Sequence, residues 1–267
     1  MYGISPTDPG REIDWGKTSG DYGLYRPGYP ESFWGRLEGI GAGVAGQRVI
    51  DLATGTGGLA RRFAERECRV VGLDISHGQV REAARLAAEA GLRARWIVAR
   101  AEATGLAAAS WDLVSASQCW LYFDRPRAIR EVKRLLAPGG RLLTCHLCWL
   151  PRTDAVARET EALVLRYNPS WTAADYAGEI PDCPKWAEGE FEVASTFWYD
   201  EALPFTAESW RGRIRACRGV GAALTASEVA SFDADLASLL TRFAPERFTV
   251  LHRIDAHLLA LASRREA

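Results

Sequence analysis

The sequence predicts an α/β fold in which a doubly wound, mostly parallel sheet carries helices on both faces. The first observation is rhythm, because residues 47–147 alternate short apolar strands with periodic helices through short connections. This alternation requires right-handed crossovers between parallel strands, which place helices on both sides of the sheet. The second observation is size, because a chain of 267 residues with 48% hydrophobic content can bury one large core.

The first half of the chain divides into elements at glycines, prolines and changes of periodicity. The first 20 residues are rich in Gly, Pro and Asp, which predicts irregular structure, and Pro30 then opens a helix that a glycine closes. Apolar runs predict five strands, at residues 47–53, 68–76, 93–99, 111–118 and 141–147. Amphipathic periodicity predicts the helices that separate them, at residues 58–67, 77–91 and 125–137, the last stopped by Pro138-Gly139-Gly140.

The rhythm changes after Pro151. A helix is predicted at residues 153–171, and an irregular aromatic stretch continues to about residue 190. The remaining segments predict two strands, at residues 192–205 and 248–262, and two helices, at residues 208–219 and 225–240.

Composition argues against several classes of partner. The formal net charge of −1 lacks the basic surplus typical of proteins that bind nucleic acid, so we expect no such partner. No apolar run approaches the ~20 residues of a membrane helix, and the N-terminus lacks a signal-peptide pattern, so we expect a soluble, cytoplasmic protein without a membrane partner. Cys145 and Cys148 have CxxC spacing, but no second Cys/His pair completes a zinc site, so we expect no metal.

A glycine-rich loop, GTGGLA at residues 55–60, follows the first predicted strand. In an open parallel sheet the ligand crevice lies at the carboxyl ends of the strands, so this loop is the expected binding site. Its GxGxxA spacing is compatible with a nicotinamide or flavin dinucleotide and equally with a nucleoside that has no phosphate. Asp51 favours the nucleoside, because its carboxylate would repel a nearby pyrophosphate. Asp74, at the end of the next strand, can accept two ribose hydroxyls and fits both ligands.

Five motifs in this order resemble the class I methyltransferases that use S-adenosylmethionine. Over residues 47–147 they read VIDLATGTGGLA, VVGLDIS, ARAEATGL, WDLVSASQCWLYFD and VKRLLAPGGRLL. The N-terminal DYGLYRPGYP is similar to a segment of members that methylate small molecules. The resemblance implies a three-layer fold with seven strands in the order 3-2-1-4-5-7-6, the last antiparallel, and a helical, aromatic cap.

The resemblance also divides the chain, which we expect to be a single methyltransferase domain over residues 1–267. Its expected parts are an N-terminal lid segment with the first helix at 1–45, a cofactor-binding half at 47–150, a cap insertion at 151–190, and C-terminal elements at 191–267 that complete the sheet and the substrate pocket.

Carried over by position, the resemblance assigns eleven residues to the site of S-adenosylmethionine and its product S-adenosylhomocysteine. It gives the methionine end to Asp51, Ala53, Gly55 and Gly57, the ribose to Asp74, the adenine to Ile75, Ala101 and Glu102, the sulfonium to Gln118, and closure over the cofactor to Tyr22 and Arg26.

Three positions depart from the family pattern. Ala53 stands where the family has the first loop glycine, and Arg100 stands where an acid usually precedes the AE pair. Leu121-Tyr122 replaces a common His-Trp pair after the fourth strand. The first two departures concern cofactor affinity, and the third concerns the substrate side.

Methyl transfer from a sulfonium is an in-line displacement, for which the protein mainly aligns the nucleophile and excludes water. The acceptor would be an O, N or C nucleophile of a small metabolite or natural product in a closed pocket. His146 and Tyr122 are the candidate catalytic residues. His146 follows the fifth strand and is either a general base or a structural histidine, and Tyr122 is either a base or a pocket wall.

The candidate substrate residues are aromatic or basic, namely Trp120, Tyr122, Trp149, Arg211 and Arg215. The rings suit an aromatic or cationic acceptor, or alternatively they seal the cap onto the sheet. The two arginines share a helix face with Arg218, which either binds a carboxylate or phosphate or is an ordinary solvated face.

Two other functions stay open at the level of sequence. One is an NAD(P)-dependent oxidoreductase, which the glycine spacing alone allows. The other is a catalytically silent protein that binds S-adenosylmethionine, because the acceptor side has no diagnostic chemical signature. The acceptor, the methylated atom and the oligomeric state stay open as well.

Overall fold

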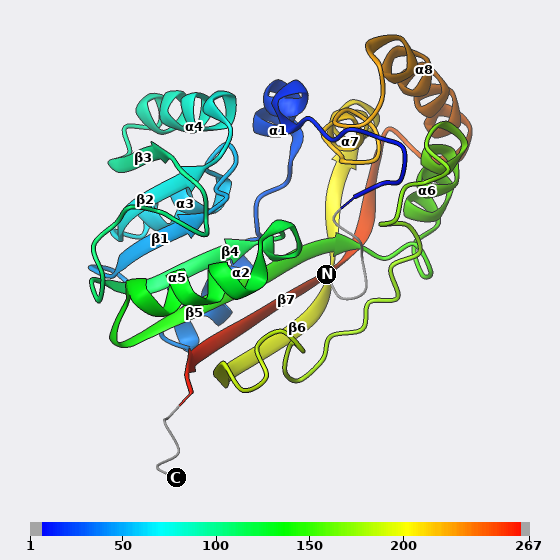
Figure 1. The fold of residues 1–267 in the computed structure, drawn as a ribbon. Coiled ribbons are helices and arrows are strands. Elements are labelled where there is room, and N and C mark those ends of the chain that lie inside the picture. The colour runs from blue at the N-terminus through cyan, green and yellow to red at the C-terminus, as the bar shows by residue number, and fades with distance from the viewer. Residues whose placement is uncertain (1–6, 263–267) are drawn as a thin grey trace.

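Seven strands form one sheet in the computed structural model, which describes residues 7–262, and their order is β3-β2-β1-β4-β5-β7-β6 (Figure 1). The strands are β1 (Arg48–Leu52), β2 (Arg69–Asp74), β3 (Ala94–Val98), β4 (Trp111–Ser117), β5 (Leu136–Trp149), β6 (Phe191–Thr206) and β7 (Arg247–Leu261). β7 runs antiparallel to both of its neighbours, and the other pairs are parallel. The predicted strand order and the antiparallel last strand are confirmed.

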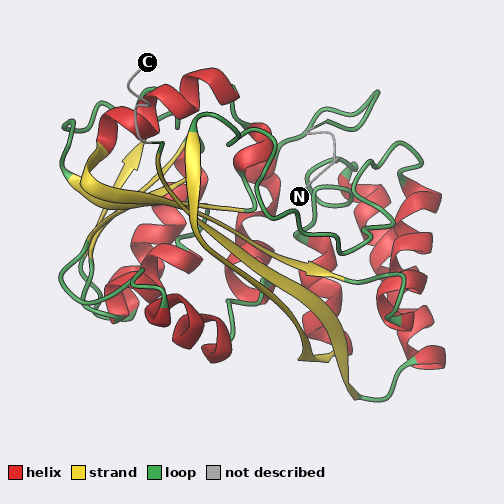
Figure 2. Cartoon of the chain, turned by 90° about the horizontal axis from the view of Figure 1, so that it is seen from below, coloured by secondary structure: helices red, strands yellow, loops and turns green. Residues whose placement is uncertain are grey.

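Helices cover both faces of the sheet, which lies between them when seen from below (Figure 2). They are η1 (Trp15–Thr18), α1 (Ser19–Tyr25), α2 (Glu31–Gly39), α3 (Gly58–Glu65), α4 (His77–Glu89), η2 (Trp120–Tyr122), α5 (Arg125–Leu135), α6 (Ala155–Tyr167), α7 (Ala207–Arg215) and α8 (Ala226–Phe243). Polar side chains cap several of their N-termini. Asp124, for example, accepts a hydrogen bond from the backbone N–H of Arg127 at the start of α5.

Two hydrophobic cores lie on the opposite faces of the sheet. Successive residues of a strand point to opposite faces, so Val49 of β1 belongs to one core and Ile50 to the other. The first core contains α2, α3 and the C-terminal helices α6, α7 and α8, whereas the second contains α5. The expected three-layer arrangement follows from this division.

The helices α6 and α7 end at Tyr167 and Arg215, before the ends of the helices predicted there. Two further differences from the predicted elements have a local cause. The helix α1 falls partly within the segment expected to be irregular, where Gly20 and Gly23 mask its periodicity. The helix predicted to stop at Pro138 ends at Leu135 instead, because Leu136 already pairs with Trp111 and the residue before a proline disfavours helix. The ladder then shifts register and resumes at Leu113 and Arg141, which leaves Pro138 in an irregular part of β5.

The helix α1 lies between α4 and α7, above the sheet (Figure 1). Its Asp21 forms an ion pair with Arg215 of α7 at 2.9 Å, and its Tyr25 packs flat against the backbone of Gly212. A Cβ atom at Gly212 would lie 2.1 Å from the Tyr25 ring, so only glycine allows this approach. The N-terminal segment and the C-terminal third of the chain are therefore joined over one end of the sheet.

Candidate functional site

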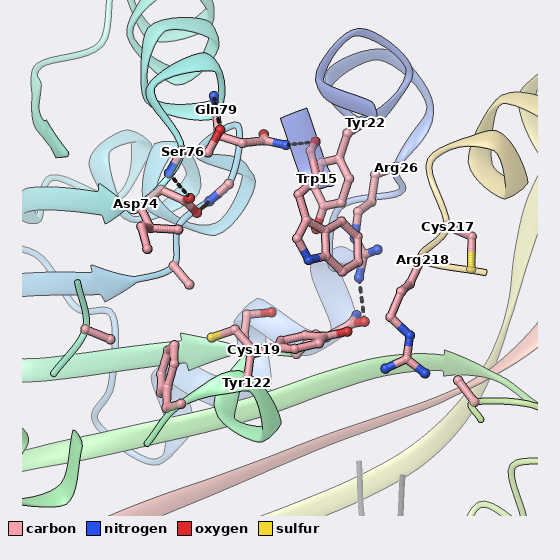
Figure 3. A pocket seen from close by; sticks show the side chains of 18 of the residues that line it. Trp15, Tyr22, Arg26, Asp74, Ser76, Gln79, Cys119, Tyr122, Cys217 and Arg218 are labelled. Carbon is pink, nitrogen blue, oxygen red and sulfur yellow. Dashed lines mark hydrogen bonds between the residues drawn. The ribbon is translucent and has the colours of Figure 1, made fainter. Parts of the chain in front are cut away.

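A cavity of about 300 Å³ opens at the carboxyl ends of β1, β2, β4 and β5. Its walls come from the loop after β1, the end of β2, and the ends of β4 and β5, and α1 and α7 add residues from above (Figure 3). This is the place where an open α/β sheet binds its ligand. We therefore take this cavity as the candidate active site.

Asp74 ends β2 and presents its carboxylate at the cavity wall. One oxygen accepts the Gly55 N–H at 3.0 Å, and the other accepts the Ser76 N–H at 2.9 Å (Figure 3). Burial raises the pKa of Asp74, while these backbone hydrogen bonds oppose the rise. A carboxylate has about four lone-pair sites, so acceptor capacity remains for two ligand hydroxyls. The nearby Oε1 atom of Gln79 is buried and has no hydrogen-bond partner among the residues that the structure describes, which adds another acceptor beside Gly55.

The loop after β1 contains three residues with positive φ. Ala53 has φ 48° and Gly55 has φ 58°, and both line the cavity. The left-handed conformation costs a residue with a Cβ atom roughly 1–2 kcal/mol, so Ala53 holds this turn less comfortably than the family's glycine would. Gly57, with φ 77°, lies outside the lining. A Cβ atom there would lie 2.5 Å from the Trp96 ring, so Gly57 lets the loop pack onto β3.

Asp51 lies behind the loop, not in the cavity lining. It is 2% exposed, and its carboxylate accepts hydrogen bonds from the Thr54 hydroxyl at 2.6 Å and the Ser115 hydroxyl at 2.7 Å. These bonds link the loop to β4. Burial raises the pKa of Asp51 to about 6, and the charge of Asp74 adds to the rise.

This raised pKa predicts how stability changes with pH. The native Asp51 binds its proton more tightly than the unfolded chain, whose pKa is near 3.8, so the native state loses stability as the pH rises from about 4 to above 6. An Asp51→Asn variant has no such loss. We expect its free energy of unfolding, relative to the natural protein, to increase by up to about 3 kcal/mol between pH 4 and pH 7.5.

Urea unfolding at several pH values measures this difference. The surface carboxylate of Asp112 provides a control of opposite sign, because the hydrogen bond from Arg48 lowers its pKa. An Asp51→Asn variant that follows the same pH curve as the natural protein would contradict the raised pKa.

Tyr22 and Arg26 extend over the cavity from α1 and the residues after it (Figure 3). The Arg26 guanidinium lies 4.8 Å from the Tyr22 ring centroid and donates a hydrogen bond to Oε1 of Gln118. Gln118 follows β4 with φ 58° and donates its own amide N–H to the Leu147 carbonyl at 2.9 Å. The lid is thereby fixed to the tips of β4 and β5.

Ile75, Ala101 and Glu102 line the end of the cavity beyond Asp74. Ile75 is 63% exposed, which is unusual for its type and leaves an apolar platform at the cavity edge. The Glu102 carboxylate accepts the Asp124 N–H at 3.0 Å and forms an ion pair with Arg100 at 3.5 Å. The departure from the family pattern at Arg100 is therefore accommodated by pairing with Glu102.

The two candidate catalytic residues occupy different environments. Tyr122 lines the cavity, and burial raises its pKa to about 12, so its phenol stays protonated at neutral pH. His146 lies outside the lining, buried in the sheet, where its Nδ1 is 2.9 Å from a carboxylate oxygen of Asp255 on β7. Burial lowers the pKa of His146, and Asp255 opposes this effect.

The candidate substrate residues divide in the same way. Trp149 lines the cavity together with Tyr122, and its indole N–H donates to the Glu161 carboxylate at 2.6 Å. Trp120 lies outside the lining and packs against Trp186, with 4.2 Å between ring centroids. Arg211 and Arg215 also lie outside it, because both bind Asp233 of α8.

Several cavity residues were not singled out from the sequence. They include Trp15, Gln79 and Tyr176. Arg218, which shares the predicted arginine face, and Arg213 of the same predicted helix also line the cavity. Helix geometry offered a signal for Arg213. It is two positions after Arg211, and residues two positions apart lie on nearly opposite faces of a helix. When Arg211 and Arg215 face α8 and α1, Arg213 must face the cavity. Trp15 lies in the segment expected to be irregular, in which no periodicity indicates the direction of a side chain.

Known proteins resemble one part of this chain more than the rest. Residues 49–140 match the family model described as a methyltransferase domain. An uncharacterized methyltransferase of Mycobacterium tuberculosis is 35% identical over 142 residues, which cover 53% of this chain and 54% of that protein. The demethylmenaquinone methyltransferase of Thermus thermophilus is 39% identical over 102 residues, 37% of this chain and 46% of that enzyme. The chain thus spans about half the length of the curated relatives it matches.

The fold is also that of solved methyltransferase structures. An S-adenosylmethionine-dependent methyltransferase of Thiobacillus denitrificans, solved in complex with S-adenosyl-L-homocysteine, has a TM-score of 0.53 at 19% identity, covering 93% of this chain and 98% of that one. The family match and the strand order agree. Residues 49–140 match a methyltransferase domain, and the sheet as a whole has the fold of the solved methyltransferase.

The segment that matches the methyltransferase model supplies the cavity wall around Asp74, whereas the segments outside it supply residues over the cavity and the opposite wall. Asp74, Ile75 and Glu102 lie within residues 49–140, and Arg26 and Arg213 lie outside them. Among residues 7–262, no group of three His, Cys, Asp or Glu side chains is arranged to hold a metal ion. No helix in that range is both long and apolar enough to cross a membrane.

Proposed function

We propose that this protein transfers a methyl group from S-adenosylmethionine to an O, N or C nucleophile of a small molecule. The observation that supports this most is the carboxylate of Asp74, which ends β2 at the cavity wall with acceptor capacity left for two ribose hydroxyls. The exposed Ile75 beside it suits the face of an adenine ring. The relatives, among them a demethylmenaquinone methyltransferase, support an acceptor of small size.

The residues of the chain fit the cofactor from one end to the other. Asp74 would hold the ribose, Ala101 and Glu102 would flank the adenine, and Arg26 would face the methionine carboxylate. The negative charge of Asp51, beneath the loop, would attract the ammonium group without direct contact. When bound, S-adenosylmethionine supplies a methyl group already activated on a positively charged sulfur.

The protein's contribution is then alignment and exclusion of water. The α1 segment roofs the cavity, and the rings of Trp15 and Tyr122 meet edge to face with centroids 5.8 Å apart. Both rings line the cavity in which the acceptor would approach the cofactor. Alignment of the reacting atoms can lower a barrier by roughly 7–11 kcal/mol. Because the Tyr122 phenol stays protonated, it would orient the acceptor by hydrogen bonding instead of removing its proton.

The proposal is tested with S-adenosylmethionine that carries a deuterated methyl group. The purified protein is incubated with this cofactor and a small-molecule extract, and mass spectrometry searches for a labelled product. We expect a deuterated small molecule together with S-adenosylhomocysteine. Thermal shift by NADH without any shift by S-adenosylhomocysteine would instead support an oxidoreductase. Binding of S-adenosylhomocysteine without transfer to any extract fraction would support a silent binding protein.

A further inference from the structure

We propose that Arg213 binds a carboxylate group of the methyl acceptor, so that the substrate is a small aromatic or apolar acid. This inference rests on the proposed methyl transfer and names the class of its substrate. It is carried by the unbalanced charge of one buried guanidinium in the cavity wall.

Arg213 lies on α7, lines the cavity and is 4% exposed. Within residues 7–262, its guanidinium has no hydrogen-bond or ion-pair partner, and its Nε atom is fully buried. Its contact is with the ring of Trp149, whose centroid lies 4.9 Å from the guanidinium carbon. Burial lowers the pKa of Arg213 to about 10, so the group still carries its charge at neutral pH. A buried charge without a partner costs several kcal/mol, which an anion in the cavity would offset.

The neighbouring arginines have partners of their own. Arg211 and Arg215 form ion pairs with Asp233, and Arg215 also binds Asp21. Arg218 lines the same cavity but is 3.0 Å from the carboxylate of Asp8. Arg213 is therefore the arginine of this cluster whose charge the described residues leave unmatched.

The position of Arg213 favours the acceptor over the cofactor. Asp74 lies at the end of β2, whereas Trp149, on which Arg213 stacks, lies at the end of β5. The order β2-β1-β4-β5 separates these two strands by three spacings, or roughly 14 Å at ~4.8 Å each. The ribose would lie at β2 and the sulfonium near Gln118 after β4. The wall at β5 is then beyond the cofactor, where the acceptor must lie.

The chemistry around Arg213 indicates the rest of the ligand. Trp149, Trp171 and Tyr176 line the same cavity, which suits an aromatic or apolar body attached to the acid. A carboxylate matches a single guanidinium through two parallel hydrogen bonds. A phosphate dianion would need a second cation. Arg26 is near enough for its charge to act on Arg213, but its guanidinium is held toward Gln118, and the proposed function assigns it to the cofactor's carboxylate.

The test uses benzoate as the probe and benzamide as its neutral analogue, both titrated into the protein saturated with S-adenosylhomocysteine. Calorimetry is expected to show benzoate binding at least tenfold tighter than benzamide. An Arg213→Gln variant should lose this preference and at least 90% of the benzoate affinity. The matched control is Arg211→Gln, which removes a guanidinium of the same helix that faces away from the cavity and should keep the preference.

A second measurement separates the two possible sources of the carboxylate. If Arg213 serves the acceptor, Arg213→Gln binds S-adenosylhomocysteine within twofold of the natural protein. A tenfold loss of S-adenosylhomocysteine affinity in this variant would assign the arginine to the cofactor's own carboxylate and overturn the inference. The natural protein tests the inference even if the variant does not fold, because equal binding of benzoate and benzamide also overturns it.

The proposed function and this inference fail in different ways. If the natural protein does not bind S-adenosylhomocysteine, the proposed methyl transfer itself is refuted. If S-adenosylhomocysteine binds but benzoate shows no preference over benzamide, only the assignment of an acidic acceptor is refuted.

Discussion

Replacement of Asp74 by asparagine is expected to weaken the binding of S-adenosylhomocysteine at least tenfold. The asparagine can keep its oxygen toward the Gly55 N–H, but its NH2 group then replaces the oxygen that accepts the Ser76 N–H, and the charge is lost. A hydrogen bond to a charged group contributes about 1.5–3 kcal/mol, so losing the pair to the ribose hydroxyls corresponds to a loss on the order of tenfold to a hundredfold. Isothermal titration calorimetry at neutral pH measures the change directly.

Asparagine is a sharper test here than alanine. Asp74→Ala would also remove the acceptor that fixes Gly55, so a weaker affinity could come from a loosened loop. The control is Asp112→Asn, which loses an ion pair with Arg48 at the opposite end of the sheet and should bind S-adenosylhomocysteine normally. Unchanged affinity in the Asp74→Asn variant would refute the ribose assignment.

Replacement of His146 by alanine is expected to lower the free energy of unfolding by about 3–5 kcal/mol. His146 on β5 lies opposite Asp255 on β7, and both residues are buried, with 5% and 1% of their surface exposed. Without the imidazole, the Asp255 carboxylate is left with the His257 ring nitrogen at 3.9 Å as its nearest imidazole. Removing one partner of a buried pair leaves a poorly compensated charge in the core, which accounts for the size of the loss.

Urea unfolding of His146→Ala measures this loss, and a double variant provides its control. His146→Leu combined with Asp255→Leu removes the buried carboxylate together with its imidazole partner, so it should be clearly more stable than His146→Ala. The catalytic hypothesis for His146 expects another outcome, namely a variant of nearly unchanged stability that binds S-adenosylhomocysteine normally but transfers methyl groups slowly. That result would show that the histidine reaches the reacting atoms through a movement of the sheet or cap.

The order of the strands could be predicted because local patterns determine it. The alternation of strand and helix over residues 47–147 requires parallel crossovers, and the family motifs fall at the strand ends. Asp74 and Gly55 meet at the cavity because neighbouring parallel strands end at one edge of the sheet. The strand order and the meeting of these two residues follow from short segments of sequence, so both could be predicted.

The acceptor wall could not be predicted to the same degree, because it depends on contacts between distant segments. The face that α7 presents to the cavity depends on Gly212 packing against Tyr25, which lies far away in the sequence. Without that contact, Arg211 and Arg215 are as plausible at the cavity as Arg213. Asp51 illustrates the same difficulty. It was expected at the methionine end of the cofactor site, but the hydroxyls of Thr54 and Ser115 hold its carboxylate beneath the loop, outside the cavity lining.

The close packing of Tyr25 on Gly212 has a consequence for how ligands enter and leave the cavity. Because Asp21 also binds Arg215, α1 cannot lift away from the sheet without breaking that ion pair or carrying α7 with it. The two helices that border the cavity, α1 and α7, are thus expected to move together. Exchange of the cofactor is therefore coupled to exchange of the acceptor. A larger side chain at position 212 would push α1 away from α7 and so open both ends of the cavity.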